Sequence, residues 1–382
     1  MKRYYRKAIV ITLPFALFCI VALLLYYSKS PGLLKQIRMY ITTYDNVKNG
    51  IIDKKDIYWL TFRKIEIKEK NEISNILDVT HPSVVYTKNK WNKHNIWIAV
   101  TPYPESIGLI SNQYENSSIY FSDITRDGKI SSIKPIKNNP IIYPDEAEYN
   151  SDPDLLFNNN KLYCLTRKFN GPNYLTNIVI QSSKDGQHWT SIKSLLKTNN
   201  LDLCPCLVKI NNVFRIYTFN TGYEVSNILS FKYNYRNYTK EICIWESKSL
   251  DNPHFTLKKK IKWEGCSNFW HGDIVYYKNK FYMIYCGCNN IYKDCFNLLT
   301  DNFKYLWFAV SNDGYNFKTC KKPIIKRAGI YRPSFFISQK DIVTILFATE
   351  KSYYDTSNKY PAGNRIGSIQ IKLADLLKQT NN

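Results

Sequence analysis

Ionisable side chains recur at matching places in a repeated hexapeptide, and they are of the types that bind polyhydroxylated ligands and move protons. The hexapeptide reads as a polar residue, proline or glycine, a small or acidic residue, and then apolar residues. Its first position holds His81, Asp152, Cys204, His271 and Arg332. Its third position holds Ser83, Asp154, Cys206, Asp273 and Ser334. Because side chains alternate along a strand, we expect both positions of a copy to point the same way.

The repeat predicts the elements that must position these side chains. Each copy continues through a polar turn into a second apolar, aromatic-rich run, as in Asn211-Asn212 before residues 213–217, which is typical of a β-hairpin. Successive copies begin 71, 52, 67 and 61 residues apart, which leaves room for four strands and their loops in each copy. We therefore predict an all-β fold, a five-bladed β-propeller of four-stranded antiparallel blades, over residues 72–382, with blades that start near residues 81, 152, 204, 271 and 332.

In a propeller the first strand of each blade lines a central channel, so the hexapeptides would bring distant residues to one channel mouth. A purely structural inner strand would favour small or apolar residues, because a buried unpaired charge is costly. We therefore interpret the ring of first positions as a candidate site. The alternative is that Asp152, Asp154 and Asp273 only satisfy backbone donors and a neighbouring arginine or histidine.

Two further segments have a structural interpretation. Residues 183–189 and 311–317 resemble the Asp-box hairpin, in which an Asp-Gly pair makes the turn and an aromatic residue packs behind it. We expect these hairpins to stabilise blades two and four.

The Asp152-Pro153 pair that begins an inner strand resembles the glycoside hydrolase clan of arabinofuranosidases, xylosidases and β-fructosidases. In that clan an Asp before Pro in blade one is the base or nucleophile, a second Asp before Pro in blade two tunes or stabilises, and a Glu in blade three is the acid. The resemblance implies glycoside cleavage between two carboxylates. Here blade one has His81 and the position of the acid is Leu203, so only Asp152 carries over.

A more extensive resemblance is to glycosidase-like propellers of bacteria and phages, which share six short motifs. The motifs are His-Pro-Ser-Val, Thr-Pro-Tyr-Pro, Glu-Asn, Ser-Asp-Pro-Asp-Leu, Trp-His with a following Asp, and Tyr-Arg. They stand here at residues 81–84, 101–104, 115–116, 151–155, 270–273 and 331–332. This resemblance implies the same fold without specifying a reaction.

Together these observations predict a glycoside hydrolase or transglycosidase that acts on a cell-surface or extracellular polysaccharide at the channel mouth. Asp152 or Asp154 is the predicted base or nucleophile, and Asp273, His271 or Glu115 would supply the proton. Cationic side chains would hold hydroxyl or carboxylate groups, and aromatic ones would stack on sugar faces. The predicted substrate-binding residues are His81, Glu115, Arg332, Trp97, Tyr103 and Trp270. No metal ligand and no cofactor is predicted.

Two other functions stay open. Leu203 in place of an acid fits a non-catalytic glycan-binding or polysaccharide-assembly protein, because binding needs no proton donor. A protein-binding propeller would use rim loops such as residues 101–117 and 352–365, but it would leave the ring of acids and histidines without a role.

The amino-terminal segment predicts a membrane anchor. Residues 8–27 are uncharged, and a helix of that length measures about 30 Å, enough to cross a bilayer. The basic tail of residues 1–7 should stay cytoplasmic, which places the propeller in the periplasm or outside the cell. A cleaved signal peptide is the rival interpretation. Residues 28–71 are predicted to form a stalk, with an accessory strand near residues 57–60 that could complete the last blade.

Charge and cysteine content limit the partners. The net charge of +22 in 382 residues would suit an anionic polysaccharide or lipid head group. Lysine is, however, scattered without a dense block and is enriched together with Asn, Ile and Tyr, which favours a bias of overall composition over a binding surface. An extracytoplasmic propeller makes nucleic acid an unsuitable partner. Nine cysteines lie outside the apolar run, and five of them fall between residues 266 and 320. They predict buried thiols or disulfides within blade four, with metal binding by the Cys-x-Cys pairs as an alternative. Oligomeric state is not predicted.

Overall fold

The computed structural model describes the repeat region and part of the segment before it. The described residues are 51–52, 56–62, 65–69, 72–76, 78–103, 114–143, 148–170, 175–198, 202–220, 241–263, 268–288, 305–326, 330–350 and 364–381. All of them belong to one compact unit of the chain. The predicted membrane helix, residues 8–27, lies outside these ranges, and within them no helix is long and apolar enough to span a bilayer.

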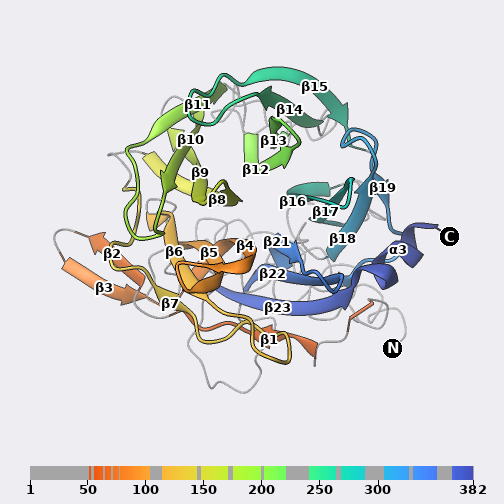
Figure 1. The fold of residues 1–382 in the computed structure, drawn as a ribbon, viewed down its shortest axis with the longest axis horizontal. Helices are drawn as coiled ribbons and strands as arrows, with labels where there is room; N and C mark the ends of the chain where they lie inside the picture. Colours follow the sequence, from red (N-terminus) through yellow and green to blue (C-terminus); the bar gives the residue numbers. More distant parts are fainter. Residues whose placement is uncertain are drawn as a thin grey trace, which may run out of the picture. The chain divides into compact units, whose positions relative to one another are not determined.

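The described strands form five antiparallel sheets around a common centre (Figure 1). Blade one contains β4 (Val79–Trp91), β5 (His94–Pro102), β6 (Ser118–Ser122) and β7 (Lys134–Pro135). Blade two contains β8 (Glu148–Asn158), β9 (Lys161–Asn170), β10 (Leu175–Ser183) and β11 (Lys193–Thr198). Blade three contains β12 (Asp202–Ile210), β13 (Val213–Asn220), β14 (Glu241–Ser247) and β15 (Thr256–Lys262). Blade four contains β16 (Asn268–Tyr277), β17 (Lys280–Cys288), β18 (Tyr305–Ser311), β19 (Lys318–Thr319) and β20 (Ile325–Lys326). Blade five contains β21 (Ile330–Ile337), β22 (Ile342–Glu350), β23 (Asn364–Lys372) and β1 (Tyr58–Trp59).

The first strand of each blade lies nearest the centre of the ring (Figure 1). Each of these strands contacts the first strands of both neighbouring blades, in the cyclic order β4, β8, β12, β16, β21 and back to β4. The predicted five-bladed β-propeller is therefore confirmed.

The ring is closed by a strand from outside the repeats. β1 pairs antiparallel with β23, with Tyr58 opposite Ser368 and Trp59 opposite Gly367. The Leu60 N–H then donates to the Ile366 carbonyl at 3.0 Å, and the Leu60 and Phe62 side chains are buried. The accessory strand expected near residues 57–60 thus supplies the outermost strand of the last blade.

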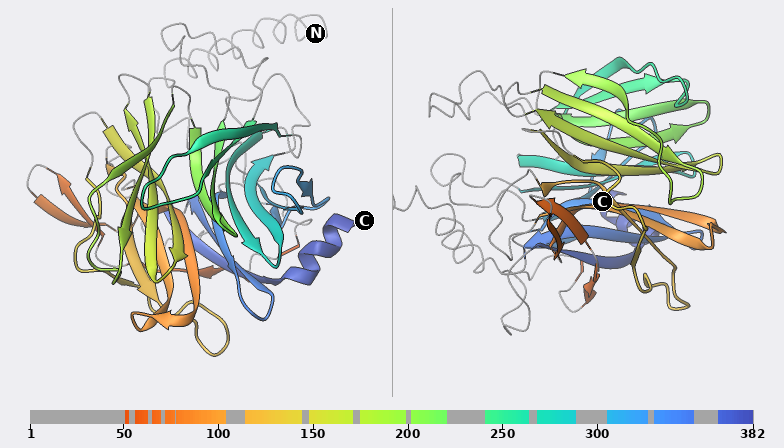
Figure 2. Two further views of the ribbon diagram at one scale, coloured as in Figure 1. Left: turned by 45° about the horizontal axis from the view of Figure 1, so that its top comes forward. Right: turned by 90° about the vertical axis from the view of Figure 1, so that its left-hand side faces the viewer.

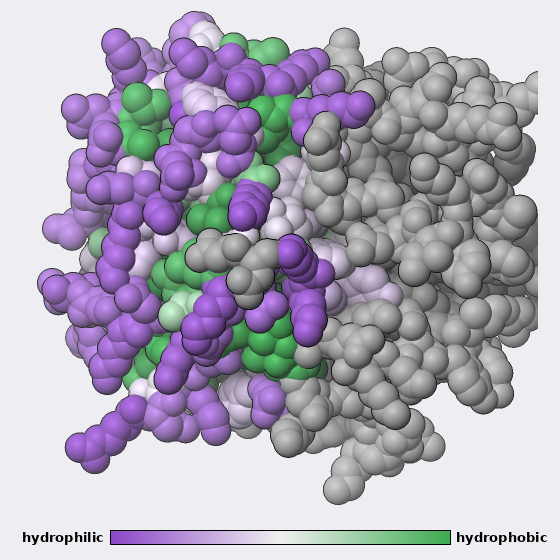
Figure 3. All heavy atoms as spheres, turned by 90° about the vertical axis from the view of Figure 1, so that its right-hand side faces the viewer, coloured by the Kyte–Doolittle hydropathy of each residue, from purple (hydrophilic) through white to green (hydrophobic). Residues whose placement is uncertain are grey.

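A two-stranded sheet and a helix of the described residues lie outside the blades. β2 (Ile65–Glu69) and β3 (Glu72–Ile76) form a separate two-stranded sheet. Helix α3 (Leu373–Asn381) follows β23 directly and contacts β18 and β23, so it bridges blades four and five (Figure 2). On the side that carries α3, the described surface is mainly hydrophilic with smaller hydrophobic areas (Figure 3).

Each hexapeptide makes a β-bulge. The register of the first two strands shifts at the hexapeptide in all five blades, for example between Ser151 and Asp154. The first residue adopts a positive φ at His81 (49°), Asp152 (50°), Cys204 (48°) and Arg332 (44°). The second residue is proline in these four copies, and proline cannot donate to the ladder, which favours a bulge there.

The bulge corrects the prediction that first and third positions point the same way. The third-position side chains instead reach the next blade. Backbone N–H groups of the neighbouring blade donate to Ser83 Oγ (2.9 Å), Asp154 Oδ2 (2.6 Å), Asp273 Oδ2 (3.0 Å) and Ser334 Oγ (3.0 Å), and Cys206 Sγ donates to the Gly272 carbonyl at 3.3 Å. These five contacts link blade one to two, two to three, three to four, four to five, and five to one.

The two Asp-box hairpins have the same local structure. Ser183 Oγ accepts from the Gly186 N–H at 2.7 Å, and Ser311 Oγ accepts from the Gly314 N–H at 2.9 Å. Gly186 lies against the ring of Trp97, so closely that a Cβ there would come within 2.2 Å of it. Their predicted structural role is supported by these contacts.

The cysteines whose side chains the structure describes are buried. Cys164, Cys204, Cys206, Cys243 and Cys320 are free thiols. A disulfide within blade four therefore does not include Cys320, and burial raises the pKa of its thiol to about 11. Small buried thiols are common in β cores.

Candidate active site

The first positions of the five blades meet at one end of the channel, with Asp152 in the middle. His81 Nε2, His271 Nδ1 and Arg332 Nε lie 3.6, 3.7 and 3.8 Å from Asp152 Oδ1. The Cys204 N–H donates to Asp152 Oδ2 at 3.4 Å. Residues up to 251 positions apart in the sequence thus contribute to one cluster, as the repeat predicts.

Asp152 is a fully buried anion. Its exposed fraction is 0%, and burial alone would raise its pKa. His81, Arg167, His271 and Arg332 outweigh that effect and hold the pKa of Asp152 well below its usual range. The carboxyl is therefore ionised at neutral pH.

The two histidines are neutral at physiological pH. Burial lowers the pKa of His81 to about 4 although the Asp152 charge acts in the opposite direction, and burial also lowers the pKa of His271 well below its ordinary value. His81 Nδ1 is 2.8 Å from Thr101 Oγ1, which fixes the ring with Nε2 toward Asp152. Neutral imidazoles can accept protons or bind cations.

Cys204 and Arg332 complete the ring from blades three and five. Cys204 Sγ contacts His271 Nδ1, and burial raises the pKa of the thiol well above its ordinary value. Arg332 is fully buried, and its Nη1 and Nη2 donate at 3.0 Å to the carbonyls of Gly272 and Pro153. Arg332, which we predicted to hold substrate groups, therefore ties blades two, four and five together beneath Asp152.

Glu115 is the second acid at this end of the channel. It is 4% exposed. Burial and the Asp152 charge raise the pKa of Glu115 to about 8, although Arg167 and a hydrogen bond with Ser151 act in the opposite direction. Glu115 therefore carries a proton at neutral pH, next to a carboxylate that does not. Two neighbouring carboxyl groups, one with a raised and one with a lowered pKa, are the usual arrangement for a general acid and a general base in catalysis.

Arg167 belongs to the site although the sequence analysis did not select it. Its Nε lies 3.0 Å from Asp152 Oδ2 and donates to Ser151 Oγ at 3.1 Å. Arg167 stands opposite Ser151 in the pairing of β8 with β9. It lies outside the repeated hexapeptide, so only its position in the second strand of blade two, opposite the motif, could have indicated it.

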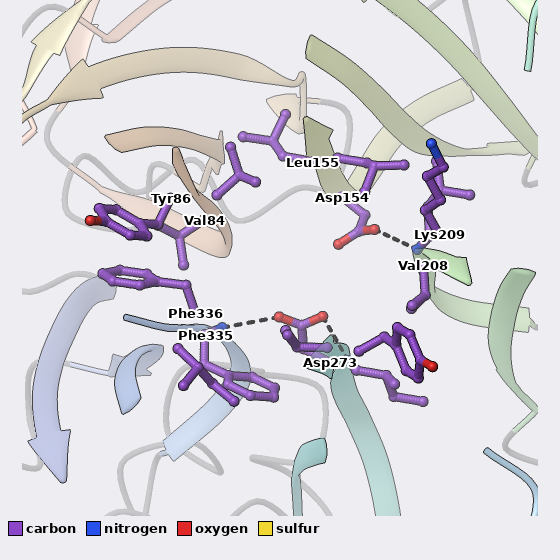
Figure 4. A pocket seen from close by; sticks show the side chains of 16 residues that line it. Val84, Tyr86, Asp154, Leu155, Val208, Lys209, Asp273, Phe335 and Phe336 are labelled. Carbon is purple, nitrogen blue, oxygen red and sulfur yellow. Dashed lines mark hydrogen bonds between the residues drawn. The ribbon is translucent and has the colours of Figure 1, made fainter. Parts of the chain in front are cut away.

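Asp154 and Asp273 lie in a different layer from Asp152. Their carboxylates point into a cavity of about 200 Å³ farther along the channel, from opposite sides (Figure 4). Val84, Tyr86, Lys209 and Phe336 also line this cavity. Burial, followed by the neighbouring Asp273, raises the pKa of Asp154 to about 8, and burial also raises that of Asp273. The structure does not bring these two predicted catalytic residues to the ring around Asp152.

The three predicted stacking residues have different positions. Trp97 is 1% exposed and packs in the core with Trp91 and Phe121, so the structure does not bring it to the mouth. Tyr103 is half-buried, and its N–H donates to the Asp78 carbonyl at 3.0 Å. The side chain of Trp270 lies outside the described part of the chain.

His81, Asp152 and His271 could hold a metal ion. Their donor atoms all lie within 4.8 Å of one another. The 3.6 and 3.7 Å separations exceed a hydrogen bond of about 2.7–3.2 Å and are close to the ligand spacing of about 3.3–3.6 Å around a tetrahedral ion bound at about 2.0–2.2 Å. Neutral imidazoles and an ionised carboxylate are also the protonation states that metal binding requires. The sequence alone predicts no metal ligand, although the His, Asp, His pattern among the first positions is a signal that could have indicated one.

The sequence matches no model of a protein family and no curated protein at a significant level. The fold is similar to that of an N-acetylgalactosamine deacetylase from F. plautii in complex with the blood group B trisaccharide. The TM-score is 0.62, with 18% identity over 84% of this chain and 96% of that chain.

Glycoside hydrolases of family 43 have a similar fold. A β-xylosidase/α-arabinofuranosidase from a compost metagenome in complex with xylotriose gives a TM-score of 0.52, with 11% identity over 77% of this chain and 91% of that chain. A family 43 enzyme from Xanthomonas citri gives 0.52, with 7% identity over 81% and 90%. At the level of the fold, these likenesses confirm the resemblance to the clan of arabinofuranosidases and xylosidases.

Proposed function

We propose that the protein removes an acyl substituent, such as the acetyl group of an N-acetylated sugar, from a glycan at the channel mouth, with a divalent cation held by His81, Asp152 and His271. The observation that carries the proposal is the convergence of two neutral imidazoles and one ionised carboxylate. A His and carboxylate set of this kind is typical of hydrolytic metal sites. The similar fold of a sugar deacetylase supports the choice of substrate.

The chain's own residues have defined roles in this proposal. A bound divalent cation polarises a carbonyl oxygen and lowers the pKa of a bound water. Thr101 orients His81 from behind, at 2.8 Å. Arg167 keeps Asp152 ionised and in place. Glu115, protonated at neutral pH, would donate a proton to the departing amine or alcohol.

Cleavage of a glycosidic bond is the second candidate. Here Asp152 would act as the carboxylate and Glu115 as the acid, since Glu115 is protonated and Asp152 ionised at neutral pH. The family 43 folds support it. Against it, Arg167 and Arg332 flank Asp152, and a buried leucine, Leu203, stands where the clan has its acid.

The experiment uses the full chain in detergent, stripped with a chelator and reloaded with Zn²⁺, Mn²⁺ or Co²⁺. It is incubated with N-acetylated oligosaccharides, and released acetate and new reducing ends are measured in parallel. We expect acetate, no reducing ends, and dependence on the added metal. His271→Gln should lower the rate at least about 100-fold, as expected when one ligand of a catalytic metal is lost.

A matched control is available in blade one. His94 Nδ1 lies 3.1 Å from Asp123 Oδ2, which makes a second His–Asp pair away from the channel mouth, and His94→Gln should keep full activity. Reducing ends without acetate would establish the glycosidase instead. Binding of glycans with neither product would establish the glycan-binding alternative and reject both enzymes.

We also propose that residues 8–27 anchor the protein in a membrane with the propeller outside the cytoplasm, where a polysaccharide is the substrate. The uncharged run and the preceding basic residues support this topology. Protease added to intact cells or spheroplasts should digest the propeller, and a chain without residues 1–27 should no longer sediment with membranes. Protection of the propeller in intact spheroplasts would reject the topology.

A further inference from the structure

Several buried polar atoms at the mouth end of blades one and two have no hydrogen-bond partner. Asn150 is fully buried and neither atom of its amide has a partner, and Arg167 Nη1 and Thr176 Oγ1 also lack one. The same holds for three atoms of blade one, which are Thr80 Oγ1, Asn116 Oδ1 and Ser118 Oγ. Each unsatisfied buried group costs about 1–3 kcal/mol. Arg167 and Thr176 share one face of blade two, because Thr176 pairs with Phe169, two residues after Arg167, whereas Asn150 pairs with Lys168 on the opposite face. The two unpartnered atoms on the Arg167 face indicate a polar occupant there.

The pairing of the strands places this set beside the catalytic ring. Asn150 directly precedes Ser151 and Asp152, and Thr80 directly precedes His81. Arg167 pairs with Ser151. Thr176 pairs with Phe169, two residues after Arg167. The set is therefore next to Asp152 without being part of its ring.

Arg167 is the cationic member of the set and is held in one orientation. Its Nε is bound by Asp152 and Ser151. Its Cζ lies 5.5 Å from the ring centroids of both Tyr149 and Phe169. Nη1 is the nitrogen that remains to donate. A guanidinium fixed by aromatic rings loses little side-chain entropy when it binds a ligand.

The charges around Asp152 favour an anionic ligand. Two guanidinium groups, Arg167 and Arg332, face this single carboxylate. A cation at His81 and His271 would add further positive charge. The chain as a whole carries +22, which attracts polyanions over a distance.

We infer that Arg167, together with the unpartnered hydroxyl of Thr176 on the same face of blade two, forms a subsite for a carboxylate-bearing sugar, so that the glycan substrate is acidic. Arginine matches a carboxylate better than it matches a hydroxyl, because its planar N–H groups suit the two oxygens. The hydroxyl of Thr176 would bind a hydroxyl group of the same sugar. The inference rests on the proposal that the channel mouth binds a glycan.

The test compares two forms of one ligand on the metal-free full chain, so that binding is measured without turnover. The probes are hyaluronan, chondroitin and polysialic acid oligosaccharides and their carboxyl-reduced derivatives. Calorimetry should show at least about tenfold weaker binding of the reduced form of any oligosaccharide that binds. Arg167→Gln should remove that difference, and Arg126→Gln, which changes an arginine of the Thr125–Lys129 turn, should leave it unchanged.

The outcomes separate this inference from the proposed function. Equal affinity for the acid and reduced forms, or binding of no acidic probe, overturns the inference, whereas acetate release from neutral N-acetylated glycans would still support the deacylase. If Arg167→Gln weakens both forms equally, Arg167 only positions Asp152, and the subsite is rejected. If Arg167→Gln does not fold, the comparison of the two ligand forms on the wild-type chain decides alone.

Discussion

Replacing Glu115 with glutamine should change how the stability of the protein depends on pH. Glu115 is buried, and its pKa is about 8 in the folded protein against 4.5 for an ordinary glutamate. Between these values the folded state holds a proton that the unfolded state releases. Wild-type stability therefore contains a contribution that is complete below pH 4.5 and is lost as the pH rises toward 8.

The size of this loss follows from the two pKa values. At about 1.4 kcal/mol for each pKa unit, the rise from pH 4.5 to pH 8 costs the folded wild type about 4 kcal/mol. Glutamine resembles the protonated acid and cannot ionise, so the variant should not show this loss. We expect Glu115→Gln to be about 4 kcal/mol more stable, relative to wild type, at pH 8 than at pH 4.5.

Urea denaturation of both chains at half-unit pH steps, with a chelator present, measures the difference. The contribution of His81 to stability has the opposite pH dependence, because the pKa of His81 falls from 6.5 to about 4 on folding. This contribution is present above pH 6.5 and is lost as the pH falls toward 4. Since both chains contain the same histidines, subtraction isolates Glu115. A difference in unfolding free energy that stays constant over this pH range would refute the assigned burial of Glu115.

Three further predictions concern the fold and can be checked by urea midpoints. Ser334→Ala removes the acceptor of a backbone N–H in blade one, so it should cost about 1–3 kcal/mol. Gly186→Ala would place a Cβ 2.2 Å from the Trp97 ring at a positive φ of 75°. It should therefore lower the free energy of unfolding more than Gly128→Ala, where the nearest atoms are 3.4 Å away at the end of a flexible side chain. Equal losses of stability in the two variants would contradict the close contact. A chain that lacks residues 1–62 loses β1 and should be less stable and prone to associate through the uncovered β23 edge, and unchanged stability would show that β1 is dispensable.

The repeat was sufficient to predict the ring of first positions. His81, Asp152 and His271 could be placed together because the same hexapeptide begins five inner strands, and their contacts agree with that prediction. The direction of the third positions was predicted wrongly because strand alternation assumes an unbroken ladder, whereas the proline at the second position interrupts it. Asp154 therefore binds the backbone of blade three.

Residues outside the repeat could not be assigned by the same reasoning. Arg167 has no counterpart in a motif, and its role depends on which strand pairs with the hexapeptide and in which register. Trp97 is a predicted ligand-stacking residue because tryptophan often stacks on sugars. Its side chain instead lies in the core, because Gly186 of the Asp-box hairpin in the next blade packs on the Trp97 ring. Such contacts between blades do not leave a local pattern in the sequence.

The bulge explains how one short motif serves both the site and the fold. The first residue, in the left-handed region, leaves the ladder and turns toward the channel mouth, while the third residue re-enters the strand and binds the neighbouring blade. Asp152 receives contacts from blades one, three, four and five, so its environment depends on the closure of the ring. β1, which completes blade five, is far from Asp152 in sequence, yet any slippage of that blade would move Arg332 and change the electrostatics of the site. Stability of the closure and activity at the mouth should therefore be lost together.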